Sequence, residues 1–279
     1  MRYWIASGVL SVLLGAVFVV FMALQSRAQE KVQYDVVVFG DSMVGLCRDE
    51  TSVTAVLEEF LQRPVYNAAF GGTCLAVQDK DLEVNYTMAL LNMVSLSKAI
   101  AADDFGAQRT VRSRRAITDY FADVIEELPR IDFEGVKTIV LIYGLNDYHA
   151  GIPTDHVGNP YDETTYGGAL RSVLRTFRAK YPDQRIILVT PTYTWYLANG
   201  LTCEEYVTGE AFLEAYVEKM LEVAAEFDVD AIDLYHGGYE HETWEDWSRF
   251  TMDGLHPNEE SRRMIAERLA EVIRTEREQ

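Results

Sequence analysis

The sequence is poor in cysteine. Only 3 of its 279 residues are cysteines, which is too few, and an odd number, for a disulfide scaffold. No Cys-x-x-Cys pair or histidine-rich spacing indicates a metal site, so we expect neither a metal nor another cofactor. A single bridge between Cys47 and Cys74 is one interpretation of the thiols, and three small buried side chains are the other.

Positive charge is also scarce. Lysine and arginine number 25 against 44 aspartates and glutamates, which gives a net charge of −19. This balance argues against a nucleic-acid partner, because phosphate backbones require clustered basic residues. It also disfavours docking on an anionic membrane surface. The hydrophobic content of 48% is ordinary for a globular protein and excludes wholesale disorder and a multispan membrane protein.

Charge is absent from Tyr3 to Leu24, a mainly apolar run between Arg2 and Arg27. About 20 such residues, each rising about 1.5 Å, span a hydrocarbon core of about 30 Å. We expect residues 1–30 to form one transmembrane signal-anchor that holds an extracytoplasmic domain, residues 31–279, at the cell membrane. The alternative is a cleaved signal peptide and a secreted domain.

Short β-branched runs alternate with amphipathic helical patterns over the rest of the chain. This alternation predicts an α/β fold in which crossover helices join parallel strands. The predicted strands are residues 35–39, 65–69, 137–143, 185–190 and 229–234. The predicted helices outside the segment between the second and third strands are residues 51–62, 164–180, 209–227 and 258–275.

About 65 residues separate the second predicted strand from the third, which is more than one crossover helix needs. We expect a helical insertion at about 80–128, with helices over residues 86–101 and 111–128. Four arginines cluster near the second of these helices: Arg109, Arg112, Arg114 and Arg115. They form either a solvated helix face or a cap that turns its arginines toward an anionic or sugar ligand.

Four loops hold the candidate catalytic residues. In a parallel α/β sheet, ligands bind beyond the carboxyl ends of the strands. Three predicted strands are followed there by Gly40-Asp41-Ser42, by Gly71-Gly72-Thr73 and by Gly144-Leu145-Asn146-Asp147. The loop before the last helix holds Asp253-Gly254-Leu255-His256-Pro257. We expect these loops to meet at one edge of the sheet.

Together these loops contain the groups that acyl transfer requires. Ser42 is a nucleophile once a base removes its proton, and His256 is the candidate base. Asp253 lies three residues before His256, where it can fix the imidazole tautomer and stabilise the imidazolium. The N–H groups of Ser42 and Gly72 and the amide of Asn146 are candidate oxyanion donors.

In this order, the loops resemble the sequence blocks of the SGNH (GDSL-type) hydrolases. Residues 38–42, Val-Phe-Gly-Asp-Ser, resemble the first block, although Met43 follows where the family often has Leu or Ile. Residues 67–73 resemble the second block, which places the oxyanion glycine at Gly72, or at Gly71 if the register shifts by one. Residues 143–147 and 253–257 match the Gly-x-Asn-Asp and Asp-x-x-His-Pro blocks.

The resemblance implies a three-layer α/β/α sandwich with a five-stranded parallel sheet, flavodoxin-like, and a metal-free serine mechanism through an acyl-enzyme. The expected function is an extracytoplasmic serine esterase that hydrolyses O-acyl esters, with acetyl as the expected acyl group, on carbohydrate. The substrate is then a small ester or an acylated glycan. An envelope-polymer O-acyltransferase, or a lipase or lysophospholipase, using the same site are the alternatives. The oligomeric state stays open.

Two further segments of the chain hold candidates for substrate contact. His149 follows the third block and either lines the substrate cleft or is a surface loop residue. Tyr193, Trp195 and Tyr196 follow the fourth predicted strand at the same edge. These aromatic residues form either a platform for a sugar ring or acyl chain, or ordinary packing.

Overall fold

The computed structural model describes residues 31–78, 90–111, 118–209 and 211–275. The chain divides into two units, residues 1–32 and 33–279. The predicted membrane segment, residues 1–30, lies outside the described residues. None of the helices within the described ranges has the length and apolar character needed to cross a membrane.

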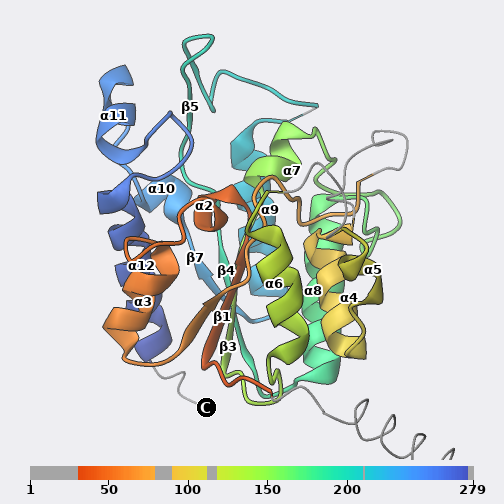
Figure 1. Ribbon diagram of the computed structural model, residues 1–279. Coiled ribbons are helices and arrows are strands. Elements are labelled where there is room, and N and C mark those ends of the chain that lie inside the picture. The colour runs from red at the N-terminus through yellow and green to blue at the C-terminus, as the bar shows by residue number, and fades with distance from the viewer. Residues whose placement is uncertain (1–30, 79–89, 112–117, 210, 276–279) are drawn as a thin grey trace, which may run out of the picture. The chain divides into compact units, whose positions relative to one another are not determined.

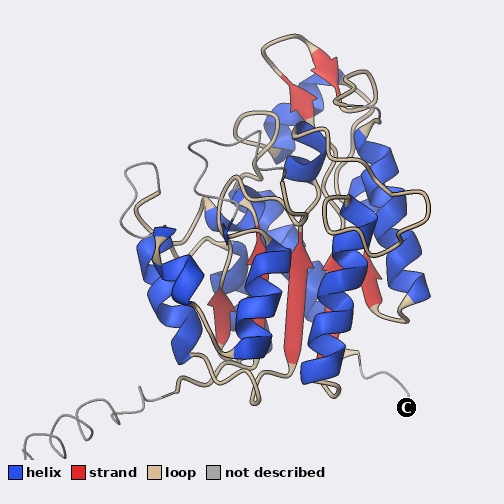
Figure 2. Cartoon of the chain, turned by 90° about the vertical axis from the view of Figure 1, so that its right-hand side faces the viewer, coloured by secondary structure: helices blue, strands red, loops and turns tan. Residues whose placement is uncertain are grey.

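Five parallel strands form the central sheet in the order β2-β1-β3-β4-β7. Their bounds are β1 (Val36–Gly40), β2 (Val65–Asn67), β3 (Thr138–Ile142), β4 (Arg185–Val189) and β7 (Asp230–Ile232). The predicted five-stranded parallel sheet is therefore confirmed, with strands that differ from the predicted ranges by a few residues at their ends. All strands point toward the same end of the molecule, where a small hairpin stands (Figure 2).

Helices cover both faces of the sheet. Val36 and Val38 of β1 join a core that also contains residues of α3 (Val53–Leu61) and α12 (Glu259–Arg274). Val37 and Phe39 point to the opposite face, because successive strand side chains alternate. There they join a larger core with α4 (Met93–Ala102), α6 (Phe121–Glu127), α8 (Tyr166–Lys180) and α9 (Leu213–Glu226). Figure 1 shows α3 and α12 on one side of the strands and α4, α6 and α8 on the other.

Side-chain caps set the start of α3, α8 and α12. Ser52, Thr165 and Asn258 each accept a hydrogen bond from the backbone N–H three residues further on. Such N-caps satisfy N–H groups that have no partner within the helix. The helices therefore begin one or two residues after the predicted starts. Helix α9 begins four residues later than predicted, at Leu213.

The helical insertion corrects the prediction most. Helix α4 begins only at Met93, where the Asn92 side chain accepts the Ser95 N–H (2.8 Å). Helix α6 begins only at Phe121. The predicted helices over residues 86–101 and 111–128 were therefore wrong in their starting points. Residues 79–89 and 112–117 lie outside the described residues.

A short helix, α5 (Gly106–Arg109), occupies the predicted link between those helices. It forms because Asp103, in the left-handed conformation (φ 50°), ends α4, and the Asp104 carboxylate then accepts the Gly106 N–H (2.9 Å). Arg109 at the end of α5 is exposed. The other three arginines of the predicted cluster, Arg112, Arg114 and Arg115, lie outside the described residues.

A two-stranded hairpin at the carboxyl edge of the sheet was not predicted. It pairs β5 (Trp195–Tyr196) with β6 (Leu201–Thr202) in antiparallel fashion. The Asn199 side chain accepts the Leu201 N–H (3.1 Å), and Gly200 adopts the left-handed conformation (φ 73°) that the turn requires. Asn-Gly is a strong hairpin signal, so the sequence did contain the information.

Candidate active site

Ser42 stands where β1 meets the next helix. Helix α2 (Ser42–Gly45) begins directly beyond the strand, and Asp41 is its N-cap. The buried Asp41 carboxylate accepts the Met43 N–H (2.9 Å). Burial raises the pKa of Asp41 to about 6, although the Met43 N–H and the nearby His256 oppose this rise. The cap fixes the turn that carries the serine hydroxyl.

The loop before α12 brings an imidazole to this hydroxyl. His256 Nε2 lies 2.9 Å from Ser42 Oγ, and His256 Nδ1 lies 2.7 Å from Asp253 Oδ2. Asp253 Oδ1 also accepts the N–H groups of Leu255 (3.1 Å) and His256 (2.8 Å). Burial alone would raise the pKa of Asp253, but these hydrogen bonds outweigh it and lower the pKa. The three predicted groups therefore form one hydrogen-bonded chain.

Backbone contacts hold this acid–base turn, residues 253–256, against the hairpin. The Trp195 N–H donates to the Gly254 carbonyl (2.8 Å), and the Gly254 N–H donates to Thr251 Oγ1 (2.9 Å). Gly254 has φ 90°, and a Cβ at this position would lie 2.1 Å from the Trp195 carbonyl oxygen. Glycine is required here both by its backbone conformation and by the close approach of the hairpin.

The loop after β2 lies directly beside Ser42. A Cβ built on Gly71 would lie 3.6 Å from Ser42 Cβ. The Gly71 N–H donates to the Tyr120 hydroxyl (2.8 Å). The sequence left Gly71 and Gly72 as alternative oxyanion donors. Tyr120 engages the Gly71 N–H, and Gly72 as the oxyanion glycine stays a prediction.

Asn146 reaches the same place from the loop after β3. It belongs to α7 (Leu145–His149), and its Nδ2 donates to the Thr73 carbonyl (3.2 Å). Its amide also interacts with the Asp41 carboxylate and lowers the pKa of that group. Asn146 therefore lies between the second loop and the residue that precedes the nucleophile. The role of this amide as an oxyanion donor stays a prediction.

Asp147 joins the two candidate oxyanion loops. Its carboxylate is fully buried and accepts the N–H groups of Leu75 and Ala76, both at 2.9 Å. Burial raises the pKa of Asp147 to about 7, even though the two N–H donors oppose the rise. A buried carboxylate costs free energy unless it is hydrogen-bonded, so this arrangement fixes the loop after β2 to α7.

The aromatic residues after β4 do not form the predicted platform as a set. Tyr193 and Trp195 are 2% and 1% exposed. The Tyr193 ring stacks on His241 with a centroid separation of 4.0 Å and packs against Trp195 at 4.9 Å. Neighbouring rings pack against both side chains, and Trp195 is also among the residues that line the cavity beside the acid–base turn. Substrate contact by Tyr193 and Trp195 stays a prediction. Tyr196 is only partly buried.

A cavity of about 600 Å³ opens beside the acid–base turn. His149, Tyr196 and Asp253 are among the residues that line it. His149 Nε2 lies 3.0 Å from the Tyr196 hydroxyl. The protein around the His149 ring partly desolvates it and lowers the pKa of the imidazole, and the nearby His256 lowers it further. Of the two alternatives for His149, the structure has the residue in the wall of a cavity next to the triad, and its contact with substrate stays a prediction.

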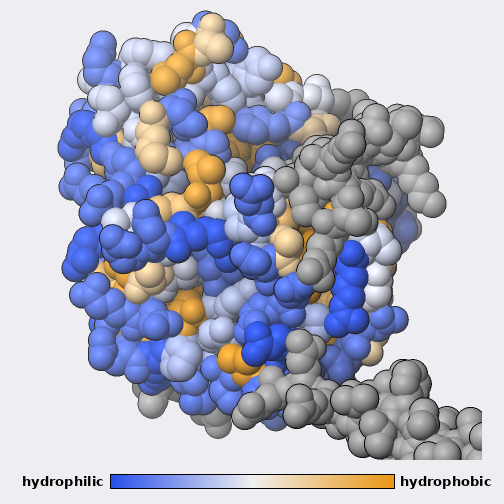
Figure 3. Space-filling model, viewed as in Figure 1, coloured by the Kyte–Doolittle hydropathy of each residue, from blue (hydrophilic) through white to orange (hydrophobic). Residues whose placement is uncertain are grey.

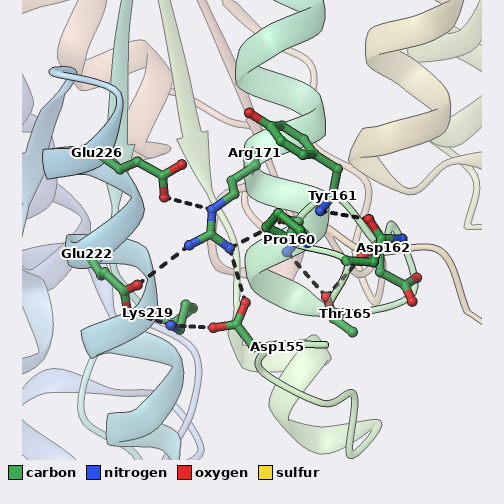
Figure 4. A network of polar contacts seen from close by, with 11 residues as sticks. Asp155, Pro160, Tyr161, Asp162, Thr165, Arg171, Lys219, Glu222 and Glu226 are labelled. Carbon is green, nitrogen blue, oxygen red and sulfur yellow. Dashed lines mark hydrogen bonds and ion pairs between the residues drawn. The ribbon is translucent and has the colours of Figure 1, made fainter. Parts of the chain in front are cut away.

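An ion-pair network supports this end of the molecule (Figure 4). Arg171 on α8 is 6% exposed and contacts Asp155 (3.0 Å) in the loop after α7 and Glu226 (2.7 Å) on α9. Glu222 lies 3.5 Å from the same guanidinium, and Lys219 lies 2.5 Å from Asp155. A buried guanidinium is tolerated when several carboxylates pair with it. The network joins the loop after α7 to α8 and α9.

The cysteines do not pair. Cys47, Cys74 and Cys203 are free, and the last two are buried. Of the two interpretations drawn from the sequence, the Cys47–Cys74 bridge is therefore wrong. No group of three or more His, Cys, Asp or Glu residues that could hold a metal occurs among the described residues.

Two features of this region escaped the sequence analysis. Tyr120 contacts the Gly71 N–H from the insertion, and Arg48 stacks over its ring at 4.6 Å. No local pattern indicates such a contact. The second is a turn with the same Asp-x-x-His spacing as the acid–base turn, from Asp233 to His236. A search for repeats of that spacing would have found it.

Comparison with known proteins agrees with this geometry. The model of the GDSL-like Lipase/Acylhydrolase family matches residues 38–264, which contain all four loops. No match was found among the curated proteins.

Several solved structures share the fold. A Lactobacillus plantarum protein is 18% identical with a TM-score of 0.61, and the match covers 87% of this chain and 97% of that one. A carbohydrate acetylesterase family member from Sinorhizobium meliloti is 16% identical, with a TM-score of 0.50 and coverage of 86% and 97%. The M. smegmatis aryl esterase is 16% identical, with a TM-score of 0.54 and the same coverage. At these identities the likeness concerns the fold alone.

Proposed function

This chain belongs to the GDSL-like lipase/acylhydrolase family and is an ester hydrolase, and we propose that it is a serine esterase that removes O-acyl groups, acetyl in particular, from carbohydrate. One observation carries the proposal: Asp253, His256 and Ser42 form a continuous hydrogen-bonded chain of 2.7 and 2.9 Å. The fold shared with a protein named as a carbohydrate acetylesterase family member supports the sugar ester as substrate.

The first step forms an acyl-enzyme. Ser42 Oγ attacks the ester carbonyl carbon while His256 Nε2 accepts the hydroxyl proton. Asp253 accepts the Nδ1–H of the imidazolium and stabilises its charge without taking the proton. The tetrahedral intermediate then expels the alcohol, whose oxygen receives the proton from His256 Nε2.

The developing oxyanion needs fixed donors. We assign this role to the N–H groups of Ser42 and Gly72 and to Asn146 Nδ2. One such donor is worth roughly 10²–10³ in turnover. The Asp147 carboxylate, which links the loops of Gly72 and Asn146, keeps these donors in register.

The second step regenerates the serine. A water molecule gives one proton to His256 Nε2 and attacks the acyl carbonyl. The second tetrahedral intermediate expels Ser42 Oγ, which recovers its proton from His256, and the carboxylic acid leaves. Water as the acceptor distinguishes an esterase from a transferase that would pass the acyl group to a sugar hydroxyl.

The proposal extends to location. The uncharged run from Tyr3 to Leu24 supports a signal-anchor over residues 1–30, or a cleaved signal peptide. Either one would place the domain of residues 31–279 outside the cytoplasm, where acylated glycans of cell surfaces are accessible.

A serine substitution tests the proposal. We expect Ser42→Ala to lower kcat/KM on p-nitrophenyl acetate by roughly 10⁴-fold or more, because the nucleophile is lost. Ser248→Ala is the matched control, since the Ser248 hydroxyl donates to the Glu245 carbonyl on the surface and should not matter for turnover. A fluorophosphonate probe should label the wild type and not Ser42→Ala. Full activity of Ser42→Ala would contradict the mechanism.

The products distinguish the esterase from its alternative. With an acetylated xylan and a free glycan acceptor, the acetyl groups should appear as acetate. Quantitative appearance of newly acetylated glycan instead would assign the same site to acyl transfer.

A further inference from the structure

Aromatic rings form one wall of the cavity beside the acid–base turn. The ring of Tyr196, on the hairpin, lies 4.7 Å from that of Tyr206 and 5.7 Å from that of His149, measured between centroids. The hydrogen bond of 3.0 Å between the Tyr196 hydroxyl and His149 Nε2 fixes the tyrosine ring. The cavity volume of about 600 Å³ lies within the usual range of small-molecule sites.

The place of this wall relative to His256 indicates which part of the ester it faces. His256 must protonate the oxygen of the departing alcohol, so the alcohol lies on the imidazole side of the reacting carbon. Asp253 and Leu255, from the same turn as His256, line the cavity. His149, also in the wall, is close enough to His256 to respond to its charge. The cavity therefore lies beside the turn that carries His256, and its lining includes residues on both sides of His256 in the sequence but not His256 or Ser42 themselves.

The chemistry of the lining suits a neutral polyol. Asn199 and Thr208 add an amide and a hydroxyl to the aromatic wall. A sugar ring offers an apolar C–H face for stacking and hydroxyls for hydrogen bonds. Among the described residues that line the cavity there is no lysine or arginine, and Asp253 contributes a negative charge. An alcohol that carries phosphate or carboxylate is therefore disfavoured.

A lipid alcohol would require an exposed apolar surface around the site. The face shown in Figure 3 is mainly hydrophilic, with hydrophobic residues in small separate groups. Three exposed apolar side chains belong to the lining or adjoin it in the sequence: Leu197, in the lining, is 39% exposed, Val207, between Tyr206 and Thr208, is 45% exposed, and Met252, before Asp253, is 51% exposed. They are too few for a lipid-binding face, but they leave the acyl chain as the competing occupant to be tested.

We propose that this cavity binds the alcohol part of the ester as a neutral sugar ring stacked on Tyr196. The inference rests on the proposed esterase function and deepens it by assigning one half of the substrate to named residues. The acyl half then lies elsewhere around Ser42.

Three esters test the assignment. Xylose tetraacetate and methyl acetate share the acyl group and differ in the alcohol, whereas methyl hexanoate and methyl acetate share the alcohol and differ in the acyl chain. We expect Tyr196→Ala to lower the ratio of kcat/KM on xylose tetraacetate to that on methyl acetate by about fivefold to tenfold, because the stacking face is lost. The methyl hexanoate to methyl acetate ratio should stay within about twofold, a change smaller than stacking produces.

Companion variants separate stacking from other effects. Tyr196→Phe keeps the ring and should retain most of the sugar preference. Tyr196→Leu keeps apolar volume on the hairpin without a flat ring and should lose the preference, even if Tyr196→Ala folds poorly. Tyr161→Ala is the control, because Tyr161 stacks on Arg175 away from the cavity and should leave both ratios unchanged.

The outcomes are distinct. A fall in the hexanoate ratio in place of the sugar ratio would assign the cavity to the acyl chain and overturn the proposal. Unchanged ratios in both Tyr196→Ala and Tyr196→Leu would overturn it as well. If the proposed function itself fails, the wild type will show no hydrolysis of either acetate that depends on Ser42, which is a different result.

Discussion

The chain contains the same histidine turn twice. In the acid–base turn, His256 Nδ1 lies 2.7 Å from Asp253 Oδ2 and the His256 N–H donates to Asp253 Oδ1 (2.8 Å). In the second turn, His236 Nδ1 lies 2.7 Å from Asp233 Oδ2 and the His236 N–H donates to Asp233 Oδ1 (3.1 Å). Each aspartate therefore orients its imidazole in the same way, by a side-chain contact and a backbone hydrogen bond.

The two turns differ in what the other imidazole nitrogen meets. His256 Nε2 faces the Ser42 hydroxyl at 2.9 Å, whereas His236 Nε2 faces the Glu214 carboxylate at 3.5 Å. The hydrogen bond with Asp233, and then Glu214, raise the pKa of His236. Two carboxylates therefore stabilise the protonated form of His236, and its Nε2 faces no hydroxyl from which to take a proton. The comparison shows that the Asp-x-x-His turn supplies orientation, and that the third partner determines whether the histidine can act as a base.

The largest expected effect separates the two aspartates. We expect Asp253→Asn to lower kcat/KM on p-nitrophenyl acetate by about 10³–10⁴-fold, because the amide stabilises the wrong tautomer and no longer the imidazolium. Asp233→Asn is the matched variant and should leave kcat/KM within about twofold, the scatter of a neutral surface change. Equal losses in the two variants would mean that the second turn also serves the reaction.

The effect of intermediate size concerns Asn146, the candidate oxyanion donor. Asn146→Ala should lower kcat by roughly 10²-fold, because one oxyanion donor is removed. KM should change little, since the lost interaction forms chiefly in the transition state. Asn159→Ala removes an exposed amide that accepts the Tyr161 N–H (3.3 Å) outside the cavity lining, and as the comparison it should leave kcat unchanged. A rise in KM with unchanged kcat in Asn146→Ala would assign Asn146 to substrate binding instead.

The smallest effect concerns stability at the second turn. The pKa of His236 is raised on folding, so its pair with Asp233 stabilises the protein fully below the unfolded histidine pKa of about 6.5. That contribution disappears as the pH rises through the higher folded pKa. Asp233→Asn keeps the backbone acceptor and should cost about 0.5 kcal/mol or less at pH 5.5, because the pair is exposed, and nothing at pH 9.

Urea unfolding of the wild type and Asp233→Asn at the two pH values measures this difference. NMR titration should also show the His236 resonance moving to a lower pKa in the variant. A stability difference that grows with pH would have the wrong sign for a histidine whose pKa is raised.

The sheet and the four loops could be predicted from the sequence because both leave a local pattern in it. Buried parallel strands are continuous β-branched runs, and three of the four loops directly follow a strand, as Ser42 follows β1. The fourth loop is marked by its Asp-x-x-His-Pro spacing before the last helix. Contacts between distant segments leave no such pattern. Tyr120 reaches the Gly71 N–H across the insertion. Tyr193 and Trp195 were placed at the correct edge, but only packing decides which ring in a cluster remains uncovered.

The insertion was harder to predict because single polar residues mark the start and the end of its helix α4. Asn92 starts α4 by accepting one N–H, and Asp103 ends it in a left-handed conformation. Both residue types are also common inside loops, so the apolar spacing extended the predicted helix backward past Asn92. The hairpin was missed for the opposite reason, since the Asn199-Gly200 signal was present and two-residue strands are too short to show alternation.

The hydrogen bond from the Trp195 N–H to the Gly254 carbonyl has a consequence for how this enzyme can change. The hairpin carries the Tyr196 ring of the cavity wall, and its backbone also holds the turn that contains Asp253 and His256. Exchanging the hairpin for a longer or shorter one would therefore disturb turnover together with selectivity. Evolution of new specificity is easier here by replacing side chains on an unaltered hairpin than by remodelling its length.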